Sequence, residues 1–349
     1  MDFSFIDVLT RRHIRAGDFP AAMVEIFDEG GTLFRRAYGA AQPGMWFDMA
    51  SVSKAVTLSM LVSLADEGRL DFDAPVLSLL PGDLPGEFTR RRLQGVTPRA
   101  LAAHTSRLPP WFPFYADGRD FWTVLERALA ESVPPAAPAY SDLNYMLLAQ
   151  VFSRCSGLSL REGLETYIKA EMGIRDMCYG PIDPELACPS CFGNQIEKQM
   201  CADRGLSFDG WRPDGEAVRG ACNDGNAFYY FGGCAGHAGI FATADAMARF
   251  GRRQLTDWNP LFVGILQESA KIRGVADVYP DGCGHNGFTG TSLWISKAHH
   301  LGSVLLTNRL CRTDSEPLLT HAYRRAVHEQ LLERLPPAVS TGNPLQNTI

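Results

Sequence analysis

The sequence lacks an excess of positive charge. It holds 33 Lys and Arg residues against 39 Asp and Glu, so the formal net charge is −6 and the pI is near 5.8. Short basic runs such as 90–92 are typical of solvated surface. Nucleic-acid binding depends on a clustered basic face, and the composition therefore argues against that function.

Long apolar runs are also missing, and none approaches the roughly 20 residues that span a bilayer. The first residues show no basic start followed by an apolar stretch and a small-residue cleavage site, which is the pattern of a secretory signal. We therefore expect a cytoplasmic protein that does not bind membranes. A chain of 349 residues can form one large domain or two that pack closely together.

Cysteine, by contrast, is frequent, with nine residues scattered along the chain. Cys188 and Cys191 form a CxxC pair, and Cys178 and Cys201 each lie ten residues outside it. Four thiols can bind zinc or an iron–sulfur cluster, so a metal- or redox-sensing module is one hypothesis. The flanking spacings are unusual and no His-Glu-x-x-His is present, so we predict free thiols, no metal and no cofactor.

Apolar periodicity and turn residues predict strands near both ends of the chain and helices between them. The predicted helices span 3–16, 51–67, 121–131, 144–155, 160–171, 244–254 and 316–334, and the predicted strands span 22–27, 32–38, 291–295 and 303–307. Residues 178–226 show no strong period and are predicted to be an irregular loop region.

This order of elements predicts an α+β fold. An antiparallel sheet would form from the N- and C-terminal segments, flanked by helices, with a mostly helical subdomain inserted. We assign 1–69 and 270–349 to the sheet subdomain and 70–269 to the helical one. A cleft where the two meet is the expected place for a site.

Ser51 and Lys54 open the predicted amphipathic helix at 51–67. Residues three apart lie on one helix face, so the serine hydroxyl and the lysine amine can touch. A serine is a weak nucleophile until a base takes its proton, and burial of a lysine disfavours its charged form. Only five lysines occur in the chain, which makes this spacing more informative, although a surface lysine on a core helix is the alternative.

Two further segments carry candidate residues. Tyr140 follows a proline-rich loop and precedes a predicted helix, so it is either a second acid/base group or a packing residue. The stretch 284–290 contains His285 among glycines, which allow close approach of a backbone to a ligand. Taken by itself, that stretch is more typical of an ordinary glycine-rich turn.

Six segments match the motifs of a known family, both in their residues and in their order along the chain. They are 48–54 (Asp-Met-Ala-Ser-Val-Ser-Lys), 67–76 (Glu-Gly-Arg-Leu-Asp-Phe-Asp-Ala-Pro-Val), 101–106 (Leu-Ala-Ala-His-Thr-Ser), 140–142 (Tyr-Ser-Asp), 236–243 (Gly-His-Ala-Gly-Ile-Phe-Ala-Thr) and 284–293 (Gly-His-Asn-Gly-Phe-Thr-Gly-Thr-Ser-Leu). The chain thus resembles the serine β-lactamase and penicillin-binding-protein superfamily over about 20–310. The most similar branch is that of class C β-lactamases, which includes esterases and D-amino-acid peptidases.

The resemblance implies a two-step acyl transfer on a small-molecule acyl substrate. Ser51 would attack a carbonyl, and Lys54 and Tyr140 would share the proton transfers. The N–H groups of Ser51 and Phe288 would form the oxyanion hole. His285 and Gly287 would stand where many β-lactamases have Lys-Thr-Gly, with His285 lining the cleft.

Two positions depart from the family pattern. Asp142 replaces the Asn of the tyrosine motif, which should alter the charge near Lys54 and disfavour anionic substrates. Arg107 stands where a glycine usually follows Thr-Ser. The preferred function is ester hydrolysis, because His-x-Gly and the lack of a signal sequence weaken a β-lactam role. The alternatives are a β-lactamase, a D-alanyl or D-amino-acid peptidase, and a catalytically silent ligand-binding homologue. The oligomeric state is left open.

Overall fold

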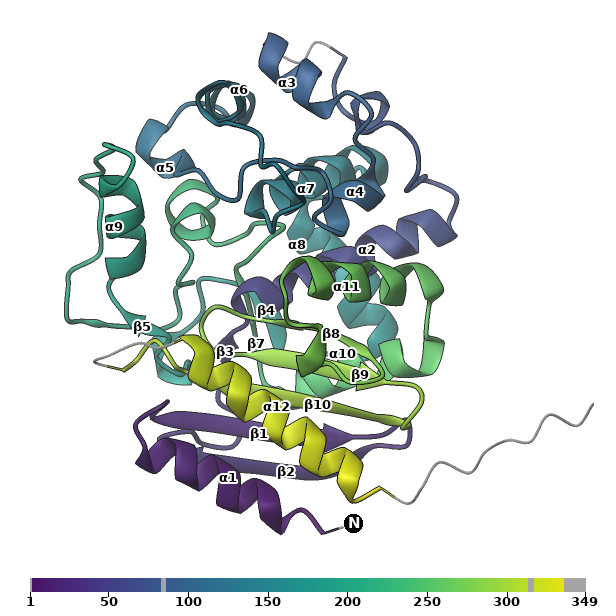
Figure 1. Cartoon of the computed structure of the whole chain (residues 1–349), viewed down its shortest axis with the longest axis vertical. Coiled ribbons are helices and arrows are strands. Elements are labelled where there is room, and N and C mark those ends of the chain that lie inside the picture. The colour runs from purple at the N-terminus through teal and green to yellow at the C-terminus, as the bar shows by residue number, and fades with distance from the viewer. Residues whose placement is uncertain (1, 83–85, 313–316, 336–349) are drawn as a thin grey trace, which may run out of the picture.

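A five-stranded antiparallel sheet built from both ends of the chain forms one side of the computed structural model, which describes residues 2–82, 86–312 and 317–335 (Figure 1). In spatial order its strands are β2 (Thr32–Gly39), β1 (Ala21–Phe27), β10 (Leu301–Thr307), β9 (Ser292–Ser296) and β8 (Cys283–Asn286). The predicted α+β fold is confirmed, and β8 at the sheet edge is the strand that contains His285.

Helices cover both faces of this sheet. They are α1 (Ser4–Arg15) and α12 (Pro317–Glu333) on one face, and α10 (Ala244–Asp257) with α11 (Pro260–Ile272) on the other. The alternation of β1 explains the arrangement, because Ala22, Val24 and Ile26 belong to the cluster with α1 and α12. Met23 and Phe27 belong to the larger core on the opposite face. A strand covered on both faces is apolar throughout, as β1 is apart from one glutamate.

Much of the remaining chain is helical, and several of its helices lie beyond α2 (Ser53–Asp66) as seen from the sheet (Figure 1). Its elements are η2 (Val76–Leu79), α3 (Glu87–Leu93), α4 (Pro98–Ala102), α5 (Phe114–Asp117), α6 (Phe121–Glu131), α7 (Asp142–Ser156), α8 (Leu160–Gly163), η3 (Leu164–Ala170), α9 (Gln195–Ala202) and η5 (Asn226–Tyr230). The division at 70 and 270 stays a prediction. Helix α10 falls in the range assigned to the helical part, yet packs on β1, β9 and β10.

Helix α2 differs from the amphipathic helix predicted for 51–67. Every residue from Ser53 to Val62 is buried, because the helix packs against α7, η3 and α11 on different sides. A helix that is apolar on all faces is a core helix. Its first turn therefore brings Lys54 into the interior of the molecule.

The region 178–226, predicted to be an irregular loop, contains several short elements. They are the strands β4 (Met177–Tyr179), β5 (Cys191–Phe192) and β6 (Ala217–Val218), the turn η4 (Pro184–Leu186) and helix α9. Strand β4 joins β7 (Ile240–Ala242) and β3 (Phe47–Asp48) in a three-stranded sheet, and β5 pairs with β6. Strands of two or three residues are too short for a visible periodicity. No described helix is both long enough and apolar enough for a transmembrane segment.

Candidate active site

Ser51 lies in a one-turn 3₁₀ helix, η1 (Ala50–Val52), that leads directly into α2. Ala50 has a φ of 45°, a left-handed conformation that is unfavourable for a residue with a side chain. The buried carboxylate of Asp48 holds this turn, because it accepts hydrogen bonds from Ala50 N at 2.8 Å and Asn223 N at 2.6 Å. Burial raises the pKa of Asp48 to about 6. The backbone before Ser51 is therefore fixed from two sides.

The Ser51 hydroxyl receives two hydrogen bonds from groups far apart in the sequence. Lys54 Nζ donates to Ser51 Oγ at 2.9 Å, as the spacing of three along a helix predicts. Tyr140 OH donates to the same oxygen at 2.8 Å. The structure thus brings the three residues predicted to be catalytic into direct contact, which places proton donors and acceptors around one hydroxyl oxygen.

Lys54 is completely buried and has three partners. Besides Ser51, its Nζ donates to His237 O at 3.0 Å and lies 2.8 Å from Asp142 Oδ1. Burial favours the neutral amine, but the charges of Asp142 and Tyr140 outweigh it and raise the pKa of Lys54. Burial by itself therefore does not decide the charge of this lysine, because an aspartate occupies the position where the family pattern has asparagine.

Tyr140 lies just before α7, and two imidazole rings lie close to its own ring. The ring of His104 lies 4.3 Å and that of His285 6.3 Å from its ring, measured between centroids. Burial and nearby cations lower the pKa of both histidines well below the usual value. Ser141 N donates to His104 Nδ1, so that ring carries its proton on Nε2. His285 Nδ1 lies 3.0 Å from Asn286 O, so His285 carries its proton on Nδ1.

Arg107, the second departure from the family pattern, holds the proline-rich loop before Tyr140. Its Nε donates to Pro135 O at 3.0 Å and a terminal nitrogen donates to Ala136 O. Its φ of 61° is in the left-handed region, where glycine is the residue without strain. These side-chain contacts stabilise an arginine at a position that favours glycine.

The turn after β8 lies against the backbone that precedes Ser51. Thr289 Oγ1 donates to Asp48 O at 2.8 Å, and Thr291 Oγ1 donates to Met49 O at 2.9 Å. Gly287 leaves room for this contact, since a Cβ there would lie 2.2 Å from Thr291 Oγ1. Phe288, the next residue, lines two cavities that Ser51 also lines. Its role in an oxyanion hole stays a prediction.

The first of these cavities, of about 570 Å³, is rich in arginine. Ser51 and Tyr140 line it together with Arg273, Arg309 and Arg324. We name this the arginine cavity. Its three arginines come from the end of α11, the loop after β10 and helix α12, and none follows a motif, so the sequence offered no signal for them.

The second cavity, of about 150 Å³, is lined by carboxyl groups. Asp142, Glu197 and Asp224 border it together with Ser51, and we name it the acidic cavity. Burial and the charge of Asp224 raise the pKa of Glu197 to about 8. Burial opposes ionisation of Asp224, but His237 at 2.9 Å holds its pKa below the usual range. Sequence reasoning did not identify Glu197 as a residue of the site.

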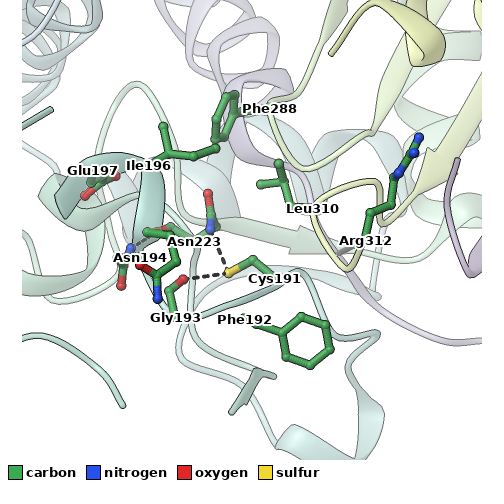
Figure 2. Close-up of a pocket in the computed structure, with 11 residues that line it drawn as sticks. Cys191, Phe192, Gly193, Asn194, Ile196, Glu197, Asn223, Phe288, Leu310 and Arg312 are labelled. Atoms are coloured by element: carbon green, nitrogen blue, oxygen red, sulfur yellow. Dashed lines mark hydrogen bonds between the residues drawn. The ribbon is translucent and has the colours of Figure 1, made fainter. Parts of the chain in front are cut away.

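A third cavity, of about 230 Å³, shares Glu197, Asn223 and Phe288 with the acidic cavity and contains the thiol of Cys191 (Figure 2). Cys191 Sγ donates to Gly193 O at 3.2 Å and accepts from Asn223 Nδ2 at 2.8 Å. Burial raises the pKa of this thiol, and such a cysteine is poorly reactive. The second half of the CxxC pair is thus held inside the protein.

All nine cysteines are free. In the described parts of the chain, no three His, Cys, Asp or Glu side chains gather in a way that could hold a metal ion. His104 and His237 act in hydrogen bonding, the former with Ser141 N and the latter with Asp224.

The matching family model covers residues 6–328, which is most of the chain, and describes the Beta-lactamase family. The chain belongs to this family. The predicted membership of the β-lactamase-like hydrolases is thereby confirmed. The family contains β-lactamase-like serine hydrolases, and the geometry around Ser51 is consistent with that membership.

Two relatives have names that denote different hydrolytic reactions. The chain is 24% identical to "N-acetylmuramyl-L-alanine amidase" of Bacillus subtilis (strain 168), covering 87% of this chain and 80% of the relative. It is 25% identical to a "Putative D-alanyl-D-alanine carboxypeptidase" of Salmonella heidelberg (strain SL476), covering 80% and 73%. A class C beta-lactamase from Rhodobacter sphaeroides superposes with a TM-score of 0.63 at 16% identity, covering 94% and 99%, which shows a shared fold.

Proposed function

We propose that this family member is a serine hydrolase that forms an acyl-enzyme on Ser51 and cleaves esters or amides of small acyl substrates. The observation that carries the proposal is the pair of hydrogen bonds that Ser51 Oγ accepts from Lys54 and Tyr140. A hydroxyl in contact with two proton-transfer groups at the start of a helix has the surroundings that nucleophilic catalysis needs. No cofactor takes part, and the cytoplasmic location remains part of the proposal.

The raised pKa of Lys54 determines the route of the first proton. A protonated lysine cannot accept the hydrogen of Ser51 until it releases one of its own. Asp142 Oδ1, 2.8 Å from Nζ, is the acceptor in contact. As Ser51 Oγ bonds to the carbonyl carbon, its proton passes to Lys54 while Lys54 gives a proton to Asp142. Lys54 thus remains an ammonium throughout.

Tyr140 then acts on the leaving group. When the carbonyl collapses and the bond to the leaving oxygen or nitrogen breaks, the Tyr140 hydroxyl donates its proton to that atom. The phenolate that remains is close to the Lys54 ammonium and recovers a proton from Asp142 through Lys54. Water repeats the sequence in reverse order and releases the acid. The net result is the transfer of the Ser51 proton to the leaving group, followed by hydrolysis.

A covalent probe tests this proposal directly. The protein would be incubated with a fluorophosphonate and, separately, with a labelled penicillin, and the modified residue located by mass spectrometry. We expect an adduct on Ser51 and no adduct in Ser51→Ala. Labelling that persists in that variant, or no adduct with either probe, would contradict the mechanism, and the latter result would favour the silent ligand-binding homologue.

Ester hydrolysis is the first candidate within this class, and a peptidase that releases a carboxylate-bearing residue is the second. The arginine cavity favours the second, because guanidinium groups match carboxylate geometry and this cavity adjoins Ser51. The name of the Salmonella relative supports the same choice. Turnover of an N-acyl-D-Ala-D-Ala peptide, compared with its C-terminal amide and a matched neutral ester, distinguishes the two. A preference for the free carboxylate supports the peptidase.

A further inference from the structure

The arginine cavity contains more positive charge than one carboxylate needs. Arg309 Nε donates to Phe288 O at 2.6 Å, a terminal nitrogen of Arg324 donates to Thr291 O at 2.8 Å, and Arg273 donates to Asn286 Oδ1. These acceptors are neutral carbonyl or amide oxygens. They satisfy individual N–H groups, but they leave all three cationic charges uncompensated.

No carboxylate of the described residues forms an ion pair with any of these three arginines. Neighbouring arginines differ in this respect, since Arg325 lies 2.7 Å from Asp277. In addition, Arg324 is only 2% exposed and its Nε has no hydrogen-bond partner among the described residues, as is also true of one terminal nitrogen of Arg273. Buried, unsatisfied donors are uncommon in proteins and call for an explanation.

The pKa values of the residues that line the cavity agree with this lack of counter-charges. Burial lowers the pKa of Arg309 to about 10, and burial together with the charges of Arg309 and Arg273 lowers that of Arg324 to about 10. Both groups are therefore still cations at neutral pH. His321, which also lines the cavity, is neutral there, because burial and the arginines lower its pKa to about 4. Three positive charges thus surround one cavity beside Ser51.

We propose that the arginine cavity binds a leaving group with two negative charges, namely the α- and side-chain carboxylates of an acidic amino-acid residue. This inference rests on the proposed acyl-transfer function. A single carboxylate would leave two of the three guanidinium groups without a counter-charge in a partly closed cavity. Two carboxylates provide acceptors for the free donors of Arg273 and Arg324 and for the remaining N–H groups of Arg309.

The position of Tyr140 assigns this cavity to the leaving group. Its hydroxyl contacts Ser51 Oγ, and the guanidinium carbon of Arg273 lies 5.9 Å from the centre of its ring. The group that Tyr140 protonates is therefore next to Arg273. Ser51 and Tyr140 also line the acidic cavity, where the carboxylates of Asp142 and Asp224 would repel an anionic acyl group. One cavity of the site is thus positively charged and the other negatively charged, so an anionic substrate binds favourably in only one orientation.

Binding to the Ser51→Ala protein measures the charge preference independently of turnover. Three ligands with the same neutral acyl group would be titrated by calorimetry, carrying alaninamide, alanine or glutamate as the second residue, each in the D and L forms. Every charge-assisted hydrogen bond contributes roughly 10- to 100-fold in affinity. We expect glutamate to bind at least about 10-fold tighter than alanine, and alanine tighter than the amide.

Substitutions assign the preference to named residues. Arg309→Gln should reduce the glutamate-to-alanine ratio about 10-fold or more, and Arg324→Gln should do the same where it folds. Arg325→Gln is the matched control on the same helix, since Arg325 already pairs with Asp277, and it should leave the ratio unchanged. Inorganic phosphate would be titrated as a compact dianion without the spacing of two carboxylates.

The outcomes separate this inference from the proposed function. Equal affinity for alanine and glutamate ligands, absence of binding by any of them, or tighter binding of phosphate than of the glutamate ligand would overturn the dicarboxylate assignment. A glutamate preference in binding, combined with no turnover by the native protein, would support the cavity assignment and contradict the hydrolase proposal. A ratio unaffected by Arg309→Gln would also refute the cavity assignment.

Discussion

Asp142→Asn is the most informative single substitution, because it restores the family residue and removes the proposed proton acceptor. The change keeps the size of the side chain but removes the negative charge 2.8 Å from Lys54 Nζ. Loss of a positioned acid/base group reduces turnover by roughly 10²- to 10⁴-fold. We expect a loss of that size at pH 7, with smaller changes in substrate affinity.

The pH dependence of the variant gives the mechanism its sharpest test. Asp142 raises the pKa of Lys54, so its removal lowers that pKa and lets neutral lysine form at lower pH. Neutral Lys54 can take the Ser51 proton by itself, and turnover of the variant should therefore recover as the pH rises above 7. Rates measured from pH 6 to pH 10 would show this rise. A variant that is more active than the native protein at pH 7 would refute the Asp142 relay.

Stability should change together with the activity. Breaking a buried ion pair costs about 3–5 kcal/mol, and the lower end applies here because Asp142 is 18% exposed and Lys54 keeps Ser51 Oγ and His237 O as acceptors. In the native protein the raised pKa of Lys54 stabilises the fold below about pH 10.5, its ordinary value, and this contribution is lost as the pH rises through the folded pKa. The cost of Asp142→Asn should therefore shrink in strongly alkaline solution.

Urea unfolding at several pH values measures that cost. Asp73→Asn is the matched control, because Asp73 pairs with Arg99 at a similar distance of 2.7 Å but both side chains are well exposed. Surface pairs contribute about 0–1 kcal/mol. Equal destabilisation by the two substitutions would show that burial of Lys54 has no energetic consequence.

Three other changes test separate parts of the site. Tyr140→Phe should reduce turnover by roughly 10²- to 10⁴-fold in steady-state kinetics, and an unchanged rate would exclude Tyr140 from proton transfer. The native protein should lose stability between about pH 4.5 and 8, because its folded form keeps a proton on Glu197 that the unfolded chain releases. Glu197→Gln should abolish this loss. Urea titrations in which the variant still loses stability over that range would contradict the assignment. Gly287→Ala places a Cβ 2.2 Å from Thr291 Oγ1 and should lower both Tm and the labelling of Ser51. The control is Gly264→Ala in helix α11, where a Cβ meets open space and stability should rise by about 0.5–1 kcal/mol.

Sequence reasoning was most effective where chemistry and local geometry coincide. The spacing of Ser51 and Lys54 predicted their contact, because side chains three apart on a helix meet whatever the rest of the chain does. The ordered motifs added Tyr140, and the structure places its hydroxyl on the same oxygen. The strands at both ends of the chain were likewise visible from their apolar runs, and they form one sheet.

Charge states and cavity walls depended on tertiary contacts instead. Burial disfavours the charged form of Lys54, and only the position of Asp142 in space shows why the ammonium is favoured. Helix α2 was expected to expose one face, but the helices packed around it bury every residue from Ser53 to Val62. In both cases the outcome depends on neighbours from distant segments, which periodicity does not reveal.

The amino-acid sequence by itself determined the family, the fold class and the identity of the candidate nucleophile, because short motifs in a fixed order along the chain identify each of them. Only the tertiary structure decided the polarity of the site. Arg273, Arg309 and Arg324 come from three separate segments without a shared motif, and Asp142, Glu197 and Asp224 line a second cavity. Electrostatic fields depend on distances in space, so two cavities of opposite charge beside one serine became visible only in the folded chain.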